Sequence, residues 1–396
     1  MRPVRWTETK LSEIRVTLVP AVLPLAAALF LSATLPAAAQ QAQEFQTQTG
    51  TVLVETLARG LQYPWAVEVM PGGALIVTER PGRLRILREG KLSPAIRGVP
   101  DVAEYGQGGL LDVALDPQFA TNRTLYLTLS ARGDGGYGTV LVRATLSDDQ
   151  RMLTDVKEVF RMNRFTRAGQ HFGSRIAIDR DGSLFFGIGD RGDGERAQDP
   201  RDHAGAILHI NADGSIPASN PYSGGTEGRA EIWSKGHRNP QGIAFDPADG
   251  KLLTVEHGAR GGDEVNNPQP GKNYGWPVIT YGKDYSGAEI GEGTAKEGME
   301  QPLYYWDPSI APGALAVYRG NMFPEWNGNL LIAALKYQLL ARLERDDTGA
   351  ITAEERLFDG EFGRIRDVIV APDGALLMVT DEQNGAVLRV SKAPTQ

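Results

Sequence analysis

The 396-residue chain contains no cysteine and only five histidines. The absence of cysteine excludes a disulfide scaffold, thiolate-held zinc and a thiol nucleophile. Two sequence patterns are also absent. There is no D-x-D-x-D-G calcium loop, and no segment after residue 50 has the pattern of a long helix. The sequence therefore indicates a β-rich fold whose chemistry depends on oxygen- and nitrogen-bearing side chains.

Positive charge is also scarce. Lysine and arginine together number 41, aspartate and glutamate number 49, and the formal net charge at pH 7 is −8. The affinity of proteins for nucleic acids depends on basic contacts to phosphates. We therefore expect no nucleic-acid partner.

The N-terminal segment 1–39 has the features of an export signal. Four basic residues precede an uncharged run over residues 16–39, which ends in Ala37-Ala38-Ala39. This run is long enough to span a membrane, so an uncleaved anchor is the alternative, but its three prolines favour cleavage. We predict a signal peptide at 1–39 and a periplasmic or secreted location, with no membrane insertion after cleavage. The segment 40–50, which is rich in Gln and Thr, is predicted to be a polar linker.

One pattern recurs along the rest of the chain: an apolar run, a turn with Pro, Asp or Gly, and a second apolar run. Such turns between β-rich runs are strong hairpin signals. Six copies lie about 60 residues apart, at 65–80, 110–130, 175–192, 242–258, 314–336 and 367–383. This spacing predicts an all-β fold, a six-bladed β-propeller with four-stranded antiparallel blades over residues 51–392. A jelly roll or a pair of β-sandwiches shares the short strands but does not predict six recurrences.

Polar residues at the ends of inner propeller strands are the candidates for a site, because loops at one end of the central channel form it. His171 precedes the third hairpin and is a candidate general base, since imidazole titrates near neutrality. A solvated loop histidine is the alternative. Arg238 and Asn239 in "GHRNPQG" offer a guanidinium fork and an amide, or simply form a turn.

Further cations precede or follow apolar runs. Lys336 lies in an apolar strand context, where a lysine that protects a sheet edge is the alternative. Arg364 and Arg366 are two residues apart and point to one face of an extended strand. An anionic ligand, or an acidic neighbour such as Asp367 or Glu361, must therefore face them. If these cations converge with Arg238 on the channel, they form a pocket for a polyanionic cofactor.

The segment Val255–Pro277 combines many glycines with the adjacent carboxylates Asp263 and Glu264. Backbone carbonyls and carboxylates are the hard oxygen ligands that Ca²⁺ prefers. A solvated glycine-rich loop with surface acids is the alternative. Beside the cationic pocket, this segment favours a polyanionic cofactor that is bound together with calcium.

Six longer motifs occur in order over about residues 50–390: GQGGLLDVALDPQF, HFGSRIAIDRDGSLFFGIGDRG, GHRNPQGIAFDP, GGDEVNNPQPGKNYGWP, LKYQLL and GRIRDVIVAPDG. Together they resemble the soluble pyrroloquinoline-quinone (PQQ)-dependent glucose and sorbosone dehydrogenases, most closely the aldose sugar dehydrogenase branch. "GHRNPQG" with "NYGWP" is the most specific combination. The resemblance implies a six-bladed propeller with the quinone over its central channel, and oxidation of an aldose sugar to the aldonolactone.

The resemblance also implies roles for the matched residues. His171 would take the proton from the anomeric hydroxyl while hydride passes from that carbon to the quinone. Arg238 would stabilise the negative charge that develops on the reacting quinone oxygen. Gln107 would lie near the substrate and the base. The remaining quinone-binding positions implied by the resemblance are Asn239, Lys336, Arg364 and Arg366.

For calcium, the resemblance implies that the backbone carbonyls of Gly258 and Ala259 hold the cofactor ion, which acts as a Lewis acid. The acids behind that loop would be Asp263 and Glu264. A second, structural calcium is implied at Tyr281, Asp284 and Asp307.

Two positions depart from the glucose-oxidising branch of the family. That branch has an acid just before the base, where this chain has Gln170, and a proline where this chain has Ala259. We therefore expect a broad range of aldose substrates, and an electron acceptor of unknown identity must reoxidise the quinone.

Two other functions fit a propeller of this kind. A calcium-dependent lactonase-type hydrolase needs several inward acids on one metal and has no use for a lysine and three arginines. A non-catalytic propeller that binds a protein or glycan needs no base, so His171 would be dispensable.

Overall fold

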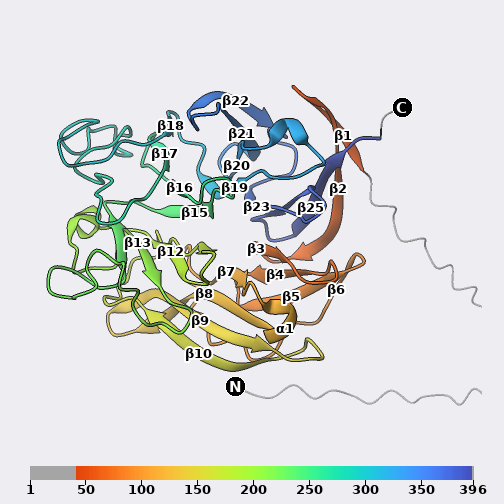
Figure 1. Cartoon of the computed structure of the whole chain (residues 1–396), viewed down its shortest axis with the longest axis horizontal. Coiled ribbons are helices and arrows are strands. Elements are labelled where there is room, and N and C mark those ends of the chain that lie inside the picture. Colours follow the sequence, from red (N-terminus) through yellow and green to blue (C-terminus); the bar gives the residue numbers. More distant parts are fainter. Residues whose placement is uncertain (1–41, 395–396) are drawn as a thin grey trace, which may run out of the picture. The chain divides into compact units, whose positions relative to one another are not determined.

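A computed structural model describes residues 42–394, so the predicted signal peptide at 1–39 lies outside the described residues. The described chain forms six antiparallel sheets in a ring, and the first strand of each lies nearest the centre (Figure 1). We number these sheets blades 1 to 6 in chain order. Blade 1 contains β3 (Pro64–Val69), β4 (Leu75–Glu79), β5 (Arg83–Arg88) and β6 (Lys91–Leu92). Blade 2 contains β7 (Leu110–Leu115), β8 (Thr124–Gly133), β9 (Gly136–Leu146) and β10 (Leu153–Arg161). Blade 3 contains β11 (Ile176–Ile178), β12 (Leu184–Ile188), β13 (Ala206–Ile210) and β14 (Ile232–Lys235).

The other three blades complete the ring. Blade 4 contains β15 (Pro240–Phe245), β16 (Leu252–Glu256), β17 (Asp263–Asn266) and β18 (Tyr304–Trp306). Blade 5 contains β19 (Pro312–Val317), β20 (Leu330–Ala334), β21 (Leu339–Arg345) and β22 (Ile351–Leu357). Blade 6 contains β23 (Ile365–Val370), β24 (Leu376–Thr380) and β25 (Gly385–Lys392), together with β2 (Gly50–Leu61) and β1 (Gln43–Thr47) from the start of the described chain. Helices in the described part are short: α1 (Phe119–Asn122), η1 (Gly194–Gln198) and η2 (Pro324–Trp326).

The predicted six-bladed, four-stranded antiparallel architecture is confirmed. Each of the six predicted hairpins forms the first two strands of one blade. This agreement has a local cause, because the turn residues and the flanking β-branched and apolar residues that form a hairpin are neighbours in the sequence.

The polar linker predicted at 40–50 is wrong over its described part. Residues 43–47 form β1, which pairs with β2, and β2 in turn pairs with β25 near the C-terminus. The two ends of the propeller chain therefore share blade 6 and close the ring. Because β1 is an edge strand with mostly exposed side chains, its polar sequence resembled that of a linker.

Apolar side chains fill the spaces between neighbouring blades. Between blades 1 and 2, for example, Trp65 and Leu84 belong to one buried cluster with Leu111 and Leu127, and each fully buried leucine stabilises the fold by about 1.5–3 kcal/mol. Close approach of inner strands also requires glycine. A Cβ at Gly313 would lie 2.6 Å from the carbonyl oxygen of Arg366, so a side chain there would separate blades 5 and 6.

The channel between the inner strands contains buried charge. Arg175 forms ion pairs with Asp112 at 2.8 Å and with Asp367 at 3.1 Å, and Glu68 borders the same space of about 250 Å³. Burial, together with the charges of Asp112 and Asp367, raises the pKa of Glu68 to about 8. Burial, opposed by Arg175, raises the pKa of Asp112 to about 7. One guanidinium is thus shared among three carboxyl groups.

Glu68→Gln is expected to stabilise the protein increasingly as the pH rises above about 4.5. Because burial raises the folded-state pKa of Glu68 from 4.5 to about 8, the folded protein holds this proton more tightly than the unfolded chain. That stability is present below about pH 4.5 and is lost as the pH rises through 8. Glutamine keeps the neutral shape, so we expect a small gain in the free energy of unfolding at pH 5 and a larger gain, on the order of a few kcal/mol, at pH 9.

Urea unfolding of wild type and Glu68→Gln at both pH values measures this difference. Glu158→Gln serves as the control, because Glu158 lies partly exposed beside Arg161. An equal difference from wild type at pH 5 and pH 9 would contradict the assignment of this proton to Glu68.

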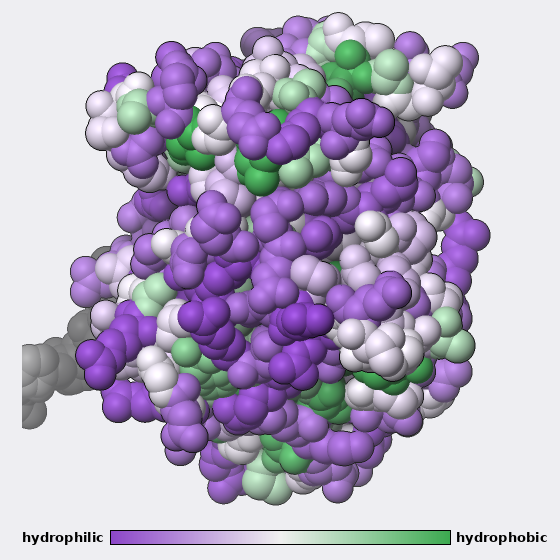
Figure 2. All heavy atoms as spheres, turned by 90° about the vertical axis from the view of Figure 1, so that its left-hand side faces the viewer, coloured by the Kyte–Doolittle hydropathy of each residue, from purple (hydrophilic) through white to green (hydrophobic). Residues whose placement is uncertain are grey.

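The face that carries the long loops of blades 3 and 4 is mainly hydrophilic, with small and separate apolar areas (Figure 2). Within residues 42–394, no helix has both the length and the apolar character needed to cross a membrane.

Candidate active site

His171 lies in the segment that leads into β11, and it is held by a carboxylate. Its Nδ1 is 2.6 Å from Oδ1 of Asp190, which follows β12 in the same blade. An ionised carboxylate only accepts hydrogen bonds, so the proton lies on Nδ1 and the lone pair on Nε2 is free. The His171 side chain is 12% exposed. Its Nε2 is therefore placed to act as a base toward a bound molecule.

Asp190 is itself buried and fully bonded. Its Oδ2 accepts a hydrogen bond from Nε1 of Trp276 at 2.8 Å, and its Oδ1 accepts one from the N–H of Gly192 at 2.7 Å. Burial alone would raise the pKa of Asp190, but the bonds from His171 and Gly192 and the charge of Arg238 hold it below its usual value. The carboxylate therefore stays ionised and fixes the imidazole ring.

The backbone of His171 has a left-handed conformation, with φ of 57°. This conformation is uncommon outside glycine and is often found at functional sites. The N–H of His171 donates to Oε1 of Gln107 at 2.8 Å. Gln107 therefore lies beside the base and helps to hold its backbone.

A cavity of about 120 Å³ lies at this end of the channel, and its walls carry Arg80, Arg364 and Arg366 together with Gln107. Arg366 donates to Asp381 at 2.6 Å and to Gln241 at 3.0 Å. Asp367, which we considered as an acidic partner of the two arginines, pairs with Arg175 instead, and the carboxylate that pairs with Arg366 is Asp381. The sequence could not show this, because Asp381 follows the adjacent strand.

The surroundings of this cavity are positive. His257, which lines it, has its pKa lowered to about 3 by burial and by the charges of Arg366 and Arg238. Its Nε2 donates to the carbonyl of Pro312 at 2.8 Å. Burial also lowers the pKa of Arg366, as do the charges of Arg364 and Arg175. A ligand that carries negative charge would relieve this repulsion.

Arg238 and Asn239 lie next to the cavity, just before β15. The Nη1 of Arg238 donates to the carbonyl oxygen of Gly258, and the guanidinium lies 5.2 Å from the ring centre of Trp276. The Oδ1 of Asn239 accepts from Gln241 at 3.1 Å, and Gln241 lines the cavity. Both residues are thus near the base and the cavity.

Lys336 was expected to lie in a strand, but the structure places it elsewhere. It lies in the turn after β20, its side chain is exposed, and its Nζ is 5.1 Å from the ring centre of Tyr337. Arg364 is also exposed and donates to the carbonyl of Leu335, the residue before Lys336. Arg364 and Leu335 line the cavity, so Arg364 lies at its rim and Lys336 follows a residue of its wall.

The predicted calcium loop is shaped by Asp263. One oxygen of Asp263 accepts from the N–H of Gly258 at 2.8 Å and the other from the N–H of Ala311 at 2.7 Å. Burial nevertheless raises the pKa of Asp263. Because both oxygens are engaged by the backbone, Asp263 holds the loop, and the Gly258 carbonyl accepts from Arg238 in this arrangement.

The other predicted metal residues have different partners. Glu264 accepts from Asn266 at 3.1 Å, and burial together with Glu256 raises the pKa of Glu264. Tyr281 donates to Gln301 and stacks on Tyr305, while Asp284 accepts from the N–H of Ser286 in an exposed turn. Among the described residues, no group of three or more His, Asp or Glu is arranged to hold a metal ion.

Sequence reasoning missed Asp190, which is the residue that orients His171. A signal for it existed, because Asp190 directly follows the apolar run of the third hairpin at the same end of the blade as His171. His237, despite its place in "GHRNPQG", is buried between Glu256 and Ser234 and contributes to packing.

Fold and site together define a six-bladed propeller protein in which a carboxylate-held histidine stands beside a cationic cavity. Residues 61–389 match the family described as Glucose / Sorbosone dehydrogenase. The chain belongs to this family.

Relatives of known name extend the comparison. Aldose sugar dehydrogenase YliI of Escherichia coli is 43% identical over 86% of this chain and 93% of its own length. The apo structure of the soluble aldose sugar dehydrogenase from Escherichia coli is 42% identical with a TM-score of 0.84, covering 86% of this chain and 100% of that one. The PQQ-bound aldose sugar dehydrogenase of Streptomyces coelicolor is 28% identical with a TM-score of 0.72, covering 89% and 100%.

Proposed function

We propose that this protein is a PQQ- and calcium-dependent dehydrogenase that oxidises aldose sugars at the anomeric carbon to aldonolactones. The observation that carries the proposal is His171, whose Nδ1 is bonded to Asp190 and whose N–H donates to Gln107 in the wall of the cationic cavity. The names of the Escherichia coli relatives and the bound PQQ in the Streptomyces coelicolor structure support the same assignment.

The residues around the cavity fit a polyanionic quinone. In the described part of the chain, the buried Nε atoms of Arg80, Arg238 and Arg366 have no hydrogen-bond partner. A buried donor without a partner costs about 1–3 kcal/mol, and carboxylates of a bound ligand would remove this cost. We assign Asn239, Arg366 and Gln107 to the inner contacts, and Lys336 with Arg364 to the rim.

The loop after β16 fits a calcium ion that is held between the protein and the quinone. The Gly258 carbonyl faces the guanidinium of Arg238, so it points toward the site. Carbonyl oxygens with ligand oxygens and few carboxylates match the flexible oxygen shell that Ca²⁺ accepts. We assign the ion to the carbonyls of Gly258 and Ala259, with Asp263 holding the loop from behind.

In the proposed reaction, Nε2 of His171 takes the proton of the anomeric hydroxyl, and the ionised Asp190 stabilises the imidazolium that forms. When bound, the quinone supplies the acceptor for the hydride that leaves the anomeric carbon, and the calcium ion supplies Lewis acidity. Arg238 provides a fixed positive charge where negative charge develops. Trp276 bonds Asp190 and lies beside Arg238, so it holds base and cation together.

Reconstitution of the purified protein tests this function. We expect that PQQ with Ca²⁺ gives sugar-dependent reduction of an artificial dye across a panel of aldoses, and that a chelator added before the quinone abolishes it. Failure to reduce the dye with every aldose would contradict the proposal. Hydrolysis of lactones without quinone would assign the site to a hydrolase instead.

A further inference from the structure

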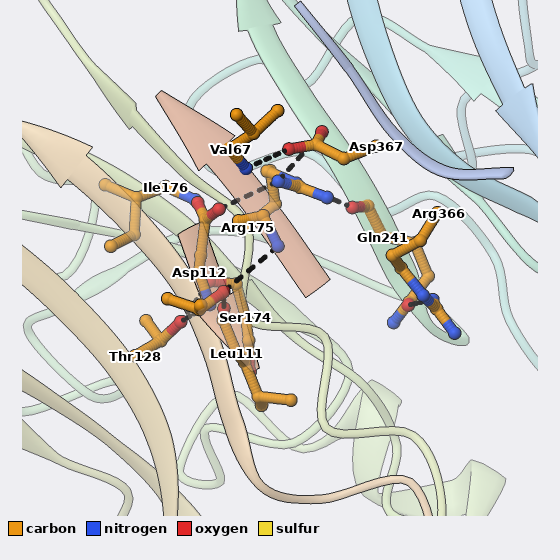
Figure 3. A network of polar contacts seen from close by, with 12 residues as sticks. Val67, Leu111, Asp112, Thr128, Ser174, Arg175, Ile176, Gln241, Arg366 and Asp367 are labelled. Carbon is orange, nitrogen blue, oxygen red and sulfur yellow. Dashed lines mark hydrogen bonds and ion pairs between the residues drawn. The ribbon is translucent and has the colours of Figure 1, made fainter. Parts of the chain in front are cut away.

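Arg175 is the point at which all six blades meet. It belongs to the segment that enters blade 3, and its side chain is only 8% exposed. Figure 3 shows its guanidinium at the centre of a network of polar contacts. Its partners come one from each of the other blades: Trp65 from blade 1, Asp112 from blade 2, Gln241 from blade 4, Gly313 from blade 5 and Asp367 from blade 6.

The contacts use every nitrogen of the guanidinium. Nη1 lies 2.8 Å from Asp112 and 3.1 Å from Asp367. Nε and Nη2 donate to the carbonyls of Gln241 and Gly313, each at 3.3 Å, and the ring centre of Trp65 is 4.2 Å away. Only a planar fork can reach acceptors in so many directions, and the single ammonium of lysine cannot.

The carboxylates of Asp112 and Asp367 also accept hydrogen bonds from main-chain N–H groups of neighbouring blades. The second oxygen of Asp112 accepts from the N–H of Ile176 at 2.6 Å, and the second oxygen of Asp367 accepts from the N–H of Val67 at 3.0 Å. These bonds join blade 2 to blade 3 and blade 6 to blade 1. The ring closes within blade 6, where β2 pairs with β25, so Asp367 connects Arg175 to the blade that closes the ring.

The same network reaches the proposed quinone contacts through Gln241. Arg175 holds the main-chain carbonyl of Gln241, while the side chain of Gln241 accepts from Arg366 at 3.0 Å and donates to Asn239 at 3.1 Å. Gln241 and Arg366 line the cavity. A displacement of Arg175 would therefore shift two cofactor-facing side chains together.

We propose that Arg175 is a positioning residue that joins the six blades beneath the cavity and, through Gln241, sets Asn239 and Arg366 in register for the cofactor. The inference rests on the proposed function for its cofactor, whereas the joining of the blades does not depend on it. A buried arginine that only stabilises one blade is the alternative.

The chain offers a matched control in Arg342. Arg342 is 1% exposed in its side chain and pairs with Glu355 and Glu344 within blade 5. Arg342→Lys is expected to lower the melting temperature and leave quinone affinity unchanged. Arg175→Lys keeps the charge but loses the fork, and we expect it to weaken quinone binding by about tenfold or more, as loss of an outer partner of a ligand-binding residue does.

The experiment titrates PQQ, in the presence of Ca²⁺, into wild type, Arg175→Lys, Gln241→Ala, the double variant and Arg342→Lys. If Arg175 acts through Gln241, the double variant binds about as weakly as the weaker single variant. Fold-changes that multiply, or wild-type affinity in Arg175→Lys, would overturn the proposal. If Arg175→Lys does not fold, Asp367→Asn replaces it in the same cycle, because that variant keeps the arginine and removes only its blade 6 partner.

Hydrogen exchange of the apoprotein separates this inference from the proposed function. In Arg175→Lys, we expect faster exchange at the amides of Val67 and Ile176, which donate to the two carboxylates, and unchanged exchange in the outer strands β21 and β22 of blade 5. Unchanged exchange at both amides would overturn the joining role. A wild type that binds no quinone but shows the exchange difference in the variant would refute the proposed function and leave the joining of the blades intact.

Discussion

Replacing His171 with alanine is expected to lower kcat by about 10²–10⁴-fold, because a positioned general base contributes that much to proton transfer. Among the described residues, the carboxylate bonded to His171 is Asp190, and it is poorly suited to replace the imidazole, because its two oxygens bond Trp276 and Gly192 and its pKa is held below its usual value. The measurement is steady-state oxidation of glucose by the reconstituted protein with saturating PQQ and Ca²⁺.

Fold and cofactor binding should survive this change. The His171 ring makes no hydrogen bond other than that to Asp190 among the described residues, so the melting temperature and the affinity for PQQ should stay close to those of wild type. His203→Gln is the control, since His203 is buried against Glu231 and Asn163 away from the cavity. An active His171→Ala enzyme, or a His203→Gln variant that loses activity while remaining folded, would contradict the assignment of the base.

Arg238→Met is expected to lower kcat by about 10²–10³-fold at saturating quinone, the cost of removing one preorganised group that stabilises developing charge. Methionine keeps much of the stem that packs near Trp276 but cannot donate to the site. The variant also frees the Gly258 carbonyl from the guanidinium, so calcium affinity should not fall. Single-turnover kinetics with bound quinone measure the chemical step directly.

Arg364→Met provides the contrast, because Arg364 is an exposed rim residue. We expect this variant to raise the dissociation constant of PQQ while kcat with saturating quinone stays near wild type. If both variants lost only quinone affinity, Arg238 would be a binding residue without a part in the chemical step.

Much of the architecture could be predicted from the sequence. The six hairpins were located to within a few residues, because turn residues and alternating apolar residues act on their immediate neighbours. The closure of blade 6 could not be located in this way, since the partner of β2 is β25 at the far end of the chain. The edge strand β1 has no buried face of its own, so its sequence carried no strand pattern.

The residues of the candidate site also fall into two groups, those that the sequence indicated and those that only the structure revealed. The residue types and motifs around His171, Arg238 and Arg366 marked them in advance, because a base and fixed cations at strand ends are visible in a linear sequence. The carboxylates that bond these residues could not be identified from the sequence. Asp190 is recognised as the group that orients His171 only when the two strand ends lie side by side, and Asp381 faces Arg366 across adjacent strands.

The sequence by itself determined the fold class and the number of blades and indicated the histidine that we propose as the base, since these depend on local patterns and on motif order. Only the tertiary structure decided which charges meet. Arg175 occurs in an ordinary strand-entry motif, yet it contacts a residue from every other blade because the six inner strands converge on one axis. Such convergence brings together residues that are up to 302 positions apart, and no local pattern of side chains records it.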